Sequence, residues 1–487
     1  MSDQESLLAV LDKLEDVEAR LLGWGVTGVN LSLEEVEVAV REAVPDADVD
    51  ALIKAMIQES LLLKISGHYR TRTAETLRLL AHLRQWFGGG SDGQVNFVQD
   101  GDNPRRVDPS EVQSWPEARH LVSDFRFRAQ PRSVPRRDRL RDAVIAGLDA
   151  GEDLRQAVAG LMPDKISRFQ ERSIQTILGW KKARRDQAAV VTAGTGAGKT
   201  YAFYLPVLAD LLTGSAAKDC PTVLAVYPRN ELLKDQLQNA YELCRKVDGL
   251  AATNGRGPLR IGALYGDVKP NPQLVAGPFG WQERSRNGRV CPFLRCPECA
   301  GPVEWRDTDR SMGNETLHCT KATCGAVIPS GLVSLTRDSL KQNPPDVLFL
   351  SMEMLNIYLQ KSLNDKVIGG WRHAPRYVLL DEVHTYGGVS GAQNAYVLRR
   401  WRQRVWNKHR AVHWVGLSAT LKRPEDFFRQ LVPIDGRTEV QCVAPEDADL
   451  ERSGKQYAVV MRGDPTSQAA LLGVTIQSLM LLARSCT

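Results

Sequence analysis

The sequence contains no apolar run long enough to span a bilayer. Its first six residues, Met-Ser-Asp-Gln-Glu-Ser, are acidic and polar, and they lack the basic segment that opens a secretory leader. A strong excess of one charge is also missing, because the formal net charge is +5 over 487 residues. This balance permits nucleic-acid binding without arguing for it. We therefore expect a cytoplasmic protein of roughly two to four domains that has no membrane partner.

Cysteine is scarce outside one short stretch, which holds five of the nine cysteines between Cys291 and Cys324. In a reducing compartment such clustering favours a metal site over disulfides. Two knuckles, C-x2-C and C-x4-C, each carry a glycine soon after the second cysteine, and four thiolates from two such turns suit tetrahedral zinc. Cys291 and His318 are alternative ligands that the spacing leaves open. We predict a structural Zn²⁺ site in a ribbon-like insertion at about residues 270–335, with the ligands Cys296, Cys299, Cys319 and Cys324.

One glycine-rich stretch, Ala193-Gly-Thr-Gly-Ala-Gly-Lys-Thr200, matches G-x-x-x-x-G-K-[ST] except that Ala193 replaces the first glycine. Glycines let backbone N–H groups surround a triphosphate, which side chains would keep away. An apolar segment at 188–192 precedes the loop and a helical segment at 200–212 follows it, as the motif requires. In such a loop the lysine reaches the β- and γ-phosphates and the threonine binds Mg²⁺. We predict an ATP site formed by Ala193, Gly194, Thr195, Gly196, Ala197, Gly198, Lys199 and Thr200.

Apolar segments alternate with helical ones through the middle of the chain. The segments at 222–227, 346–350, 376–380 and 412–417 each end in polar residues. This pattern is typical of a doubly wound parallel α/β sheet, in which ligands bind at the carboxyl ends of the strands. We expect this sheet to occupy residues 165–440.

Asp381 and Glu382 follow one of these apolar segments. A carboxylate at a buried strand end can hold Mg²⁺ through water, which is the role that we predict for Asp381. Glu382 could accept a proton from the attacking water as a general base. An Asp-Glu pair alone is weak evidence, because a solvated acidic turn is the default. The phosphate loop before it and the Ser-Ala-Thr after the next segment favour an ATPase.

These motifs together resemble those of the superfamily 2 DExH helicases. The resemblance rests on 194–200, on Pro228-Arg229, on Asp381-Glu-Val-His384 and on Ser418-Ala-Thr420. The runs at 381–391 and 397–400 are similar to a narrower branch, the MrfA-type DNA repair helicases and the large helicases DrmA and DpdJ of bacterial defence islands. The N-terminal region is most similar to the DpdJ-like helicases.

The resemblance implies a RecA-like lobe that uses ATP and Mg²⁺ to move along nucleic acid, usually DNA. It implies that Gln170 senses adenine and that His384 acts at the catalytic centre. His384 would also couple the ATP state to the grip on nucleic acid, together with Ser418, Ala419 and Thr420. The residues implied to contact the nucleic-acid backbone are Pro228, Arg229, Ser351 and Met352. Some helicases of the broader superfamily carry a four-cysteine iron–sulfur cluster, so such a cluster is the alternative to zinc.

Residues 1–90 predict a small helical domain with a hairpin. Ser32-Leu-Glu-Glu35 has the form of a capping box at a helix start. A second helix at 48–58, two short strands around Gly67 and a helix at 75–87 follow. This order resembles a winged-helix module, which binds duplex DNA through a helix in the major groove. A protein-docking domain is the alternative, because the second helix carries Lys54 as its only base.

Residues 91–164 are predicted to form an Arg-rich linker and helical region. Eight arginines between Arg119 and Arg141 alternate with Phe125 and Phe127. Arginine and aromatic side chains can follow a phosphate backbone and stack on bases. A linker packed against a neighbouring domain is the alternative that we favour.

Residues 441–487 predict one strand and one amphipathic helix, which we interpret as the start of a truncated second lobe. The resemblance implies a second RecA-like lobe that supplies an arginine finger to ATP, so we expect a longer product or a companion chain to complete the motor. The function predicted is an ATP-dependent DNA helicase or translocase in DNA repair or in defence against foreign DNA, with RNA as the other possible strand. The alternatives are a nucleic-acid-sensing ATPase subunit of a defence complex and a protein-docking scaffold.

Overall fold

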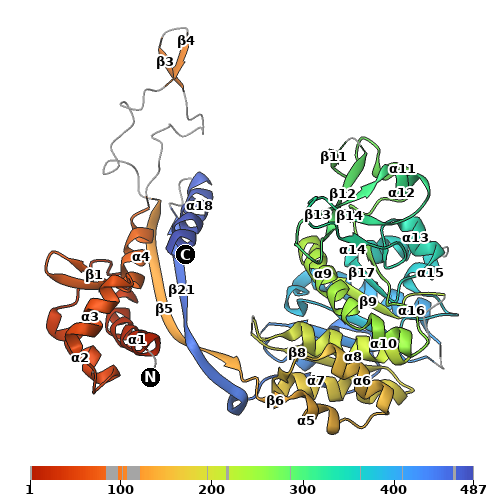
Figure 1. Cartoon of the computed structure of the whole chain (residues 1–487), viewed down its shortest axis with the longest axis horizontal. Helices are drawn as coiled ribbons and strands as arrows, with labels where there is room; N and C mark the ends of the chain where they lie inside the picture. The colour runs from red at the N-terminus through yellow and green to blue at the C-terminus, as the bar shows by residue number, and fades with distance from the viewer. Residues whose placement is uncertain are drawn as a thin grey trace. The chain divides into compact units, whose positions relative to one another are not determined.

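A computed structural model (Figure 1) describes residues 3–83, 97–100, 103–106, 121–194, 196–214, 219–285, 287–361, 364–407, 410–419, 421–463 and 468–485. The chain divides into two compact units. One unit comprises Met1–Arg132 together with Arg452–Thr487, and the other comprises Ser133–Glu451. We call them the N-terminal unit and the sheet unit.

The sheet unit contains an eight-stranded sheet in which every recorded strand pairing is parallel. The strand order is β16-β10-β17-β9-β18-β19-β8-β20. Parallel neighbours need crossover connections, and the helices between the strands supply them. The strands are β8 (Gln187–Thr192), β9 (Val223–Tyr227), β10 (Ile261–Leu264), β16 (Val333–Ser334), β17 (Val347–Ser351), β18 (Tyr377–Leu380), β19 (His413–Ser418) and β20 (Val440–Val443).

Helices cover both faces of this sheet, because alternate strand residues enter two different cores. In β9, Val223, Ala225 and Tyr227 join one core, and Leu224 and Val226 join the other. The first core is closed by α6 (Glu152–Leu161), α7 (Arg168–Gly179), α8 (Lys199–Thr213) and α9 (Asn230–Lys246). The second is closed by α14 (Met352–Tyr358), α16 (Gly388–Val405) and α17 (Pro424–Leu431). The predicted doubly wound α/β sheet, a RecA-like fold, is therefore confirmed.

Shorter elements complete the sheet unit. They are β6 (Arg139–Leu140), α5 (Arg141–Ala146), β7 (Lys165–Ile166), η3 (Trp180–Lys182), α10 (Asp248–Thr253), α13 (Arg337–Gln342), α15 (Asp365–Ile368), η5 (Val383–Thr385) and η6 (Asp447–Asp449). Because α6 packs in the first core, the second half of the region predicted as a linker at 91–164 belongs to the sheet unit.

The insertion between β10 and β16 forms a separate five-stranded sheet, β11-β12-β13-β14-β15, with antiparallel pairing throughout. Its core is aromatic, with Trp281, Phe293 and Trp305 packed together. The backbone N–H of Arg295 donates to Oε1 of Gln238 on α9 at 3.0 Å, which ties the insertion to the main sheet. Its elements are α11 (Pro272–Val275), β11 (Glu283–Ser285), β12 (Gly288–Arg295), β13 (Pro302–Arg306), α12 (Asp307–Ser311), β14 (Leu317–Cys319) and β15 (Val327–Ile328).

The first half of the N-terminal unit has the order helix, helix, helix, strand, strand, helix. The elements are α1 (Asp3–Leu22), α2 (Leu33–Ala43), α3 (Val49–Gln58), β1 (Leu62–Ile65), β2 (His68–Thr71) and α4 (Arg72–Ala81), and a short hairpin, β3 (Phe97–Asp100) with β4 (Asn103–Arg106), follows. The capping box is present, since the N–H of Glu35 donates to Ser32 Oγ and Ser32 N–H donates to the Glu35 carboxylate. The predicted helix at 75–87 begins earlier, at Arg72, and residues 84–87 lie outside the described part of the chain.

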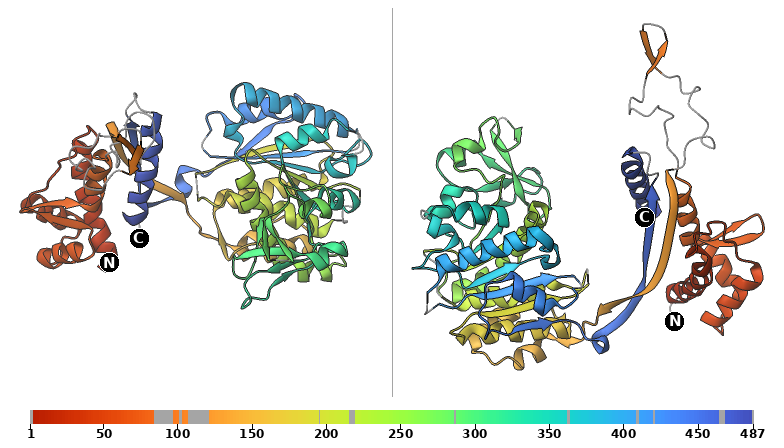
Figure 2. Two further views of the ribbon diagram at one scale, coloured as in Figure 1. Left: turned by 90° about the horizontal axis from the view of Figure 1, so that it is seen from above. Right: turned by 180° about the vertical axis from the view of Figure 1, so that it is seen from behind.

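Two long strands, most of whose residues belong to the N-terminal unit, form a two-stranded sheet. These strands are β5 (Val122–Pro135) and β21 (Leu450–Gly463), and α18 (Gln468–Ser485) follows β21. Figure 2 shows the two strands side by side in both views. The side chains of Phe125 and Phe127 are buried in this unit, and the Phe127 ring lies 5.9 Å from that of Tyr457. These aromatic side chains are therefore core residues, which contradicts the alternative in which they stack on bases.

The C-terminal residues differ from the expectation that 441–487 opens a second lobe as a separate segment. β20 is an edge strand of the main sheet and pairs with β8 from Val440↔Ala188 onward. β21 and α18 belong to the N-terminal unit, where Val474 of α18 shares a core with Leu77 and Leu80 of α4. Among the described helices, none combines the length and the hydropathy that a bilayer crossing needs.

Candidate active site

The glycine-rich loop leaves the carboxyl end of β8 and enters α8. Gly196 and Gly198 have φ angles of 77° and 82°, a region that glycine enters at no steric cost. Lys199 is the first residue of α8, and its Nζ donates to the carbonyl oxygen of Ser418 at 3.2 Å. The N–H of Ala193 donates to the same carbonyl at 3.3 Å. The predicted loop residues Gly194, Ala197 and Thr200 follow the same turn, whereas Thr195 lies outside the described residues.

Gln170 on α7 holds this loop from the side. Its Nε2 donates to the carbonyl of Gly198 at 2.8 Å, and its Oε1 accepts the N–H of Ser167 at 2.9 Å. A Cβ on Gly198 would lie 2.6 Å from Gln170 Nε2, so this contact requires glycine. The side chain predicted to sense adenine is thus joined directly to the phosphate loop. Its contact with a base stays a prediction.

Asp381 lies at the end of β18, two strands away from β8 in the sheet order. It is 8% exposed, and burial raises the pKa of its carboxyl to about 6. The neighbouring Glu382 charge raises this pKa further, while the Glu382 N–H, which donates to Asp381 Oδ1 at 2.8 Å, and the Lys199 ammonium lower it. A nearby divalent cation would favour the ionised carboxylate in the same way. Asp381, directly after β18, and Lys199, the first residue of α8, therefore lie within electrostatic reach of each other.

Glu382 has a φ of 48°, in the left-handed region that non-glycine residues rarely occupy. The turn directs its side chain toward His384, whose Nδ1 lies 3.2 Å from Glu382 Oε2. Strained backbone of this kind clusters at functional sites. The conformation thus separates the two carboxyl groups, leaving Asp381 buried and Glu382 partly exposed beside the imidazole.

Ser418, at the end of β19, connects the two halves of the site. Its backbone carbonyl accepts the hydrogen bonds from the phosphate loop, and its Oγ lies 3.4 Å from Nδ1 of His384. The residue is fully buried. Ser418, Ala419 and Thr420 are predicted to couple the ATP state to the grip on nucleic acid. Ser418 lies between the loop and His384, and Ala419 follows it in the sequence. Thr420 lies outside the described residues.

Two buried tyrosines feel the charge of Asp381, and no sequence pattern predicted them. Tyr204 of α8 and Tyr227 of β9 share a hydrogen bond between their hydroxyl groups. Burial is the main reason that the pKa of each phenol lies well above its usual value. The negative charge of Asp381 is one of the other causes. The pair therefore stays neutral, and each tyrosine lies within a run of apolar residues that gives no local signal for it.

The residues predicted to contact nucleic acid lie at the carboxyl ends of two adjacent strands. Pro228 and Arg229 follow β9, and the Arg229 side chain is exposed. Ser351 ends β17 and caps α14, because its Oγ accepts the N–H of Met354 at 3.3 Å. The Met352 side chain is 7% exposed and packs in the second core, so its backbone is the part available to a ligand. Their contact with nucleic acid stays a prediction.

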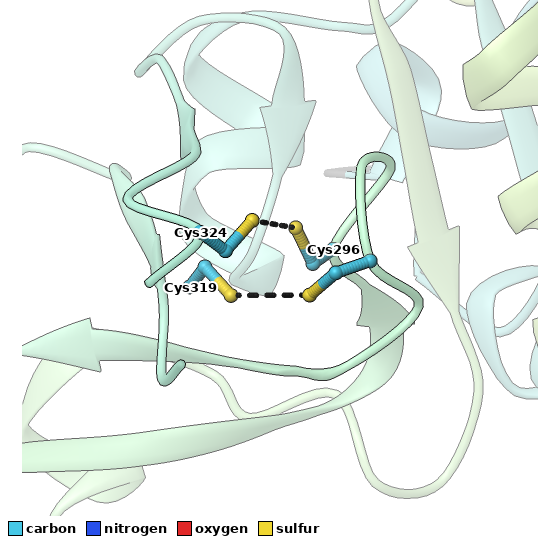
Figure 3. A group of neighbouring side chains, drawn as sticks. Cys296, Cys319 and Cys324 are labelled. Carbon is cyan, nitrogen blue, oxygen red and sulfur yellow. Dashed lines mark hydrogen bonds between the residues drawn. The ribbon is translucent and has the colours of Figure 1, made fainter. Parts of the chain in front are cut away.

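The four predicted cysteines lie together in the insertion, on the turns after β12 and around β14. The Sγ atoms of Cys296 and Cys324 are 3.6 Å apart, and those of Cys299 and Cys319 are 3.5 Å apart. All four Sγ atoms lie within 4.8 Å of one another, and Figure 3 shows the side chains of Cys296, Cys319 and Cys324 turned toward the same place. Tetrahedral zinc with Zn–S bonds of about 2.3 Å separates its sulfur ligands by about 3.8 Å. The geometry is therefore compatible with zinc.

The alternative ligands lie elsewhere. Cys291 is outside this group of thiols, and burial raises its pKa to about 12. His318 pairs with Asp309, with Nε2 2.8 Å from Oδ2. Within the cluster, the N–H of Gly301 lowers the pKa of Cys299 to about 7, whereas the pKa of Cys319 and that of Cys324 are raised, with the neighbouring thiols among the causes. Cys296, Cys299, Cys319 and Cys324 form the group that could hold a metal ion, and their role as zinc ligands stays a prediction.

Residues 167–274 match a family model described as DEAD/DEAH box helicase. Druantia protein DruE of Escherichia coli (strain UMEA 4076-1) is 23% identical over 280 residues, which cover 49% of this chain and 15% of that protein. An uncharacterised ATP-dependent helicase of Methanocaldococcus jannaschii is 27% identical over 173 residues, which cover 35% of this chain and 24% of that protein. The chain thus spans less than a quarter of the length of either curated relative.

Among solved structures, the crystal structure of the DUF1998 helicase MrfA is similar to this chain. It has 17% sequence identity and a TM-score of 0.37, and the match covers 61% of this chain and 33% of that chain. The match of residues 167–274 to the DEAD/DEAH box helicase model agrees with the predicted helicase motifs. The resemblance to DpdJ in particular stays a prediction.

Proposed function

We propose that this chain, whose residues 167–274 form a DEAD/DEAH box helicase domain, carries the ATP-binding lobe of a DNA helicase or translocase. One observation carries the proposal. The phosphate loop, the Asp381-Glu382 pair and His384 lie at the carboxyl ends of β8 and β18, and Ser418 on the intervening strand β19 contacts both groups. An ATP site of this class needs these parts in one place.

Each residue has a separate task in the proposed reaction. The loop N–H groups and Lys199 bind the phosphates, and Thr200 and Asp381 would hold Mg²⁺, which supplies charge neutralisation when bound. Glu382 is the candidate base for the attacking water, since its carboxylate is partly exposed. His384 would sense this step through Glu382 on one side and Ser418 on the other, because its Nδ1 lies within 3.4 Å of both.

DNA is the strand that we propose, and the support is the similarity of residues 381–391 and 397–400 to the MrfA-type and defence-island helicases. The curated relatives do not separate DNA from RNA, because a third relative, 28% identical over 185 residues, is the ATP-dependent RNA helicase DBP2 of Encephalitozoon cuniculi (strain GB-M1). A role in DNA repair or in defence against foreign DNA is part of the same proposal, and its support is this resemblance together with the match to Druantia protein DruE.

The proposal is tested by ATP turnover with the second lobe supplied, as a longer chain or as a companion chain. Phosphate release is measured without nucleic acid and with single-stranded DNA, duplex DNA and single-stranded RNA. We expect single-stranded DNA to stimulate turnover more than RNA does, and Lys199→Ala to abolish the stimulated rate. A rate that no nucleic acid changes would contradict a motor and favour a docking scaffold.

Strand displacement on a partial duplex separates the motor from an ATPase that only senses nucleic acid. The motor should release the displaced strand in an ATP-dependent way, and the sensing subunit of a defence complex should hydrolyse ATP without releasing it.

A further inference from the structure

Arg137 lies beside the phosphate loop, with no hydrogen bond or ion pair to the part of the chain that the structure describes. Its side chain is exposed, and its Nη2 lies 3.8 Å from the position that a Cβ on Gly198 would occupy. Gln170 approaches the same point from α7. An arginine this close to a loop built for phosphates, and unpaired among the described residues, has its guanidinium available for a ligand.

Residues on either side of Arg137 in the sequence, Arg136 and Arg139, are held by backbone contacts. The N–H of Arg136 donates to the carbonyl of Asp449 at 2.8 Å. Arg139 pairs with Ile166 in the β6–β7 ladder, and its Nε lies 2.6 Å from the Glu171 carboxylate on α7. The segment is therefore held against α7, the helix that carries Gln170. Arg137 is placed beside the loop by its neighbours before any ligand arrives.

We propose that Arg137 binds a non-bridging phosphate oxygen of the nucleotide in this loop, an inference that rests on the proposed function. A guanidinium offers two parallel N–H donors to a phosphate, and the charge-assisted bonds are stronger than neutral ones. The loop otherwise provides backbone N–H groups and the single ammonium of Lys199, whose Nζ is on the Ser418 side of the turn. Arg137 adds a second positive charge on the Gln170 side.

Equilibrium binding of Mg-ADP and of adenosine to the whole chain tests this assignment. We expect Arg137→Ala to weaken Mg-ADP binding about tenfold, the loss of one charge-assisted hydrogen bond. Adenosine binding should be unchanged, because adenosine has no phosphate. Arg137→Lys keeps the charge and loses the planar fork, so its Mg-ADP affinity should be intermediate. Arg136→Ala is the matched control, an adjacent exposed arginine whose backbone bond survives the change.

Lys199→Ala separates this assignment from the proposed function. If Lys199→Ala loses Mg-ADP and Arg137→Ala binds as the wild type does, the role of Arg137 is overturned and the nucleotide site stands. If Arg137→Ala weakens adenosine and Mg-ADP equally, the guanidinium stacks on the base and the phosphate contact is overturned. A wild-type chain with no Mg-ADP affinity would overturn both proposals.

Discussion

At the residue scale, two adjacent carboxyl groups differ because the backbone turns between them. Asp381 is buried at the end of β18, and Glu382 is turned by its positive φ toward His384. Phosphoryl transfer needs a metal-binding carboxylate and a group that orients or deprotonates water. The structure offers a separate residue for each requirement, even though the two are neighbours in the sequence.

Glu382→Gln should therefore leave ATP bound and uncleaved when a second lobe is present. The amide keeps the size and the hydrogen bonds of the side chain and loses its basicity, so turnover should fall about a hundredfold or more. Calorimetry for ATP binding and phosphate release for turnover provide the two readouts. Hydrolysis at the wild-type rate in Glu382→Gln would remove this residue from the role of base.

Another residue, Glu18 in the N-terminal unit, should make stability depend on pH. It is fully buried, and burial raises its pKa from 4.5 to about 7 against the opposing hydrogen bonds from Thr71. Between pH 4.5 and about pH 7, Glu18 holds a proton in the folded chain and releases it in the unfolded chain. The free energy of unfolding therefore falls as the pH rises through this range. The loss amounts to at most about 3 kcal/mol.

Hydrogen exchange of the α4 amides at pH 5 and pH 8 measures this effect, with the α16 amides as the internal control. Once corrected for the intrinsic exchange rate, α4 should lose protection at pH 8 in the wild type. The loss should be smaller in Glu18→Gln, because the amide stays neutral. Equal pH dependence in the two proteins would show that Glu18 is not the titrating group.

At the scale of elements, the cysteine insertion depends on two turns that are brought together by β12, β13 and β14. Cys296→Ser removes one of four converging thiols, so zinc should fall well below one equivalent per chain. Cys291→Ser is the control, since Cys291 is buried outside the group. Elemental analysis and the visible spectrum provide the readout. Iron with broad visible absorbance, or zinc lost only in Cys291→Ser, would contradict the assignment.

The elements that the sequence predicted well are those encoded by local patterns. The phosphate loop needs glycines and a lysine at fixed spacing between a strand and a helix, and these residues are contiguous at 193–200. The cysteine knuckles and the Ser32–Glu35 capping box are likewise short patterns of residues at fixed spacing. Buried apolar strands were also recognisable, because parallel sheets covered on both faces require continuous apolar runs.

Other features depend on contacts between distant residues and left no local trace. β5 pairs with β21 across more than half of the chain, so neither strand's sequence reveals its partner. From the sequence alone, Phe125 and Phe127 of β5 could be interpreted as base-stacking groups. The structure shows that both side chains are buried in the N-terminal unit. Ser418 joins the loop through its carbonyl oxygen, a group that every residue possesses. The position of Arg137 beside Gly198 follows from the β6–β7 ladder.

At the scale of the whole molecule, the described residues contain one sheet of the RecA-like kind. In the superfamily 2 helicases that the motifs resemble, ATP is bound between two such lobes, and an arginine from the second is worth about 10³–10⁵ in rate. We therefore expect residues 1–487 alone to hydrolyse ATP very slowly, even with DNA. A second lobe, supplied as a longer chain or as a companion chain, should raise the DNA-stimulated rate by orders of magnitude. Rapid DNA-stimulated turnover by residues 1–487 would require an arginine finger from this chain or from a second copy.

Equilibrium binding of ATP to residues 1–487 tests whether the loop at 193–200 and Asp381 form one magnesium–nucleotide site. One ATP should bind per chain, and EDTA should weaken this binding. Lys199→Ala and Asp381→Asn should each reduce the affinity for Mg-ATP by about tenfold or more, because each removes one charge from the phosphate–metal complex. The same affinity in the wild type and in Lys199→Ala, or binding that Mg²⁺ does not affect, would contradict the account.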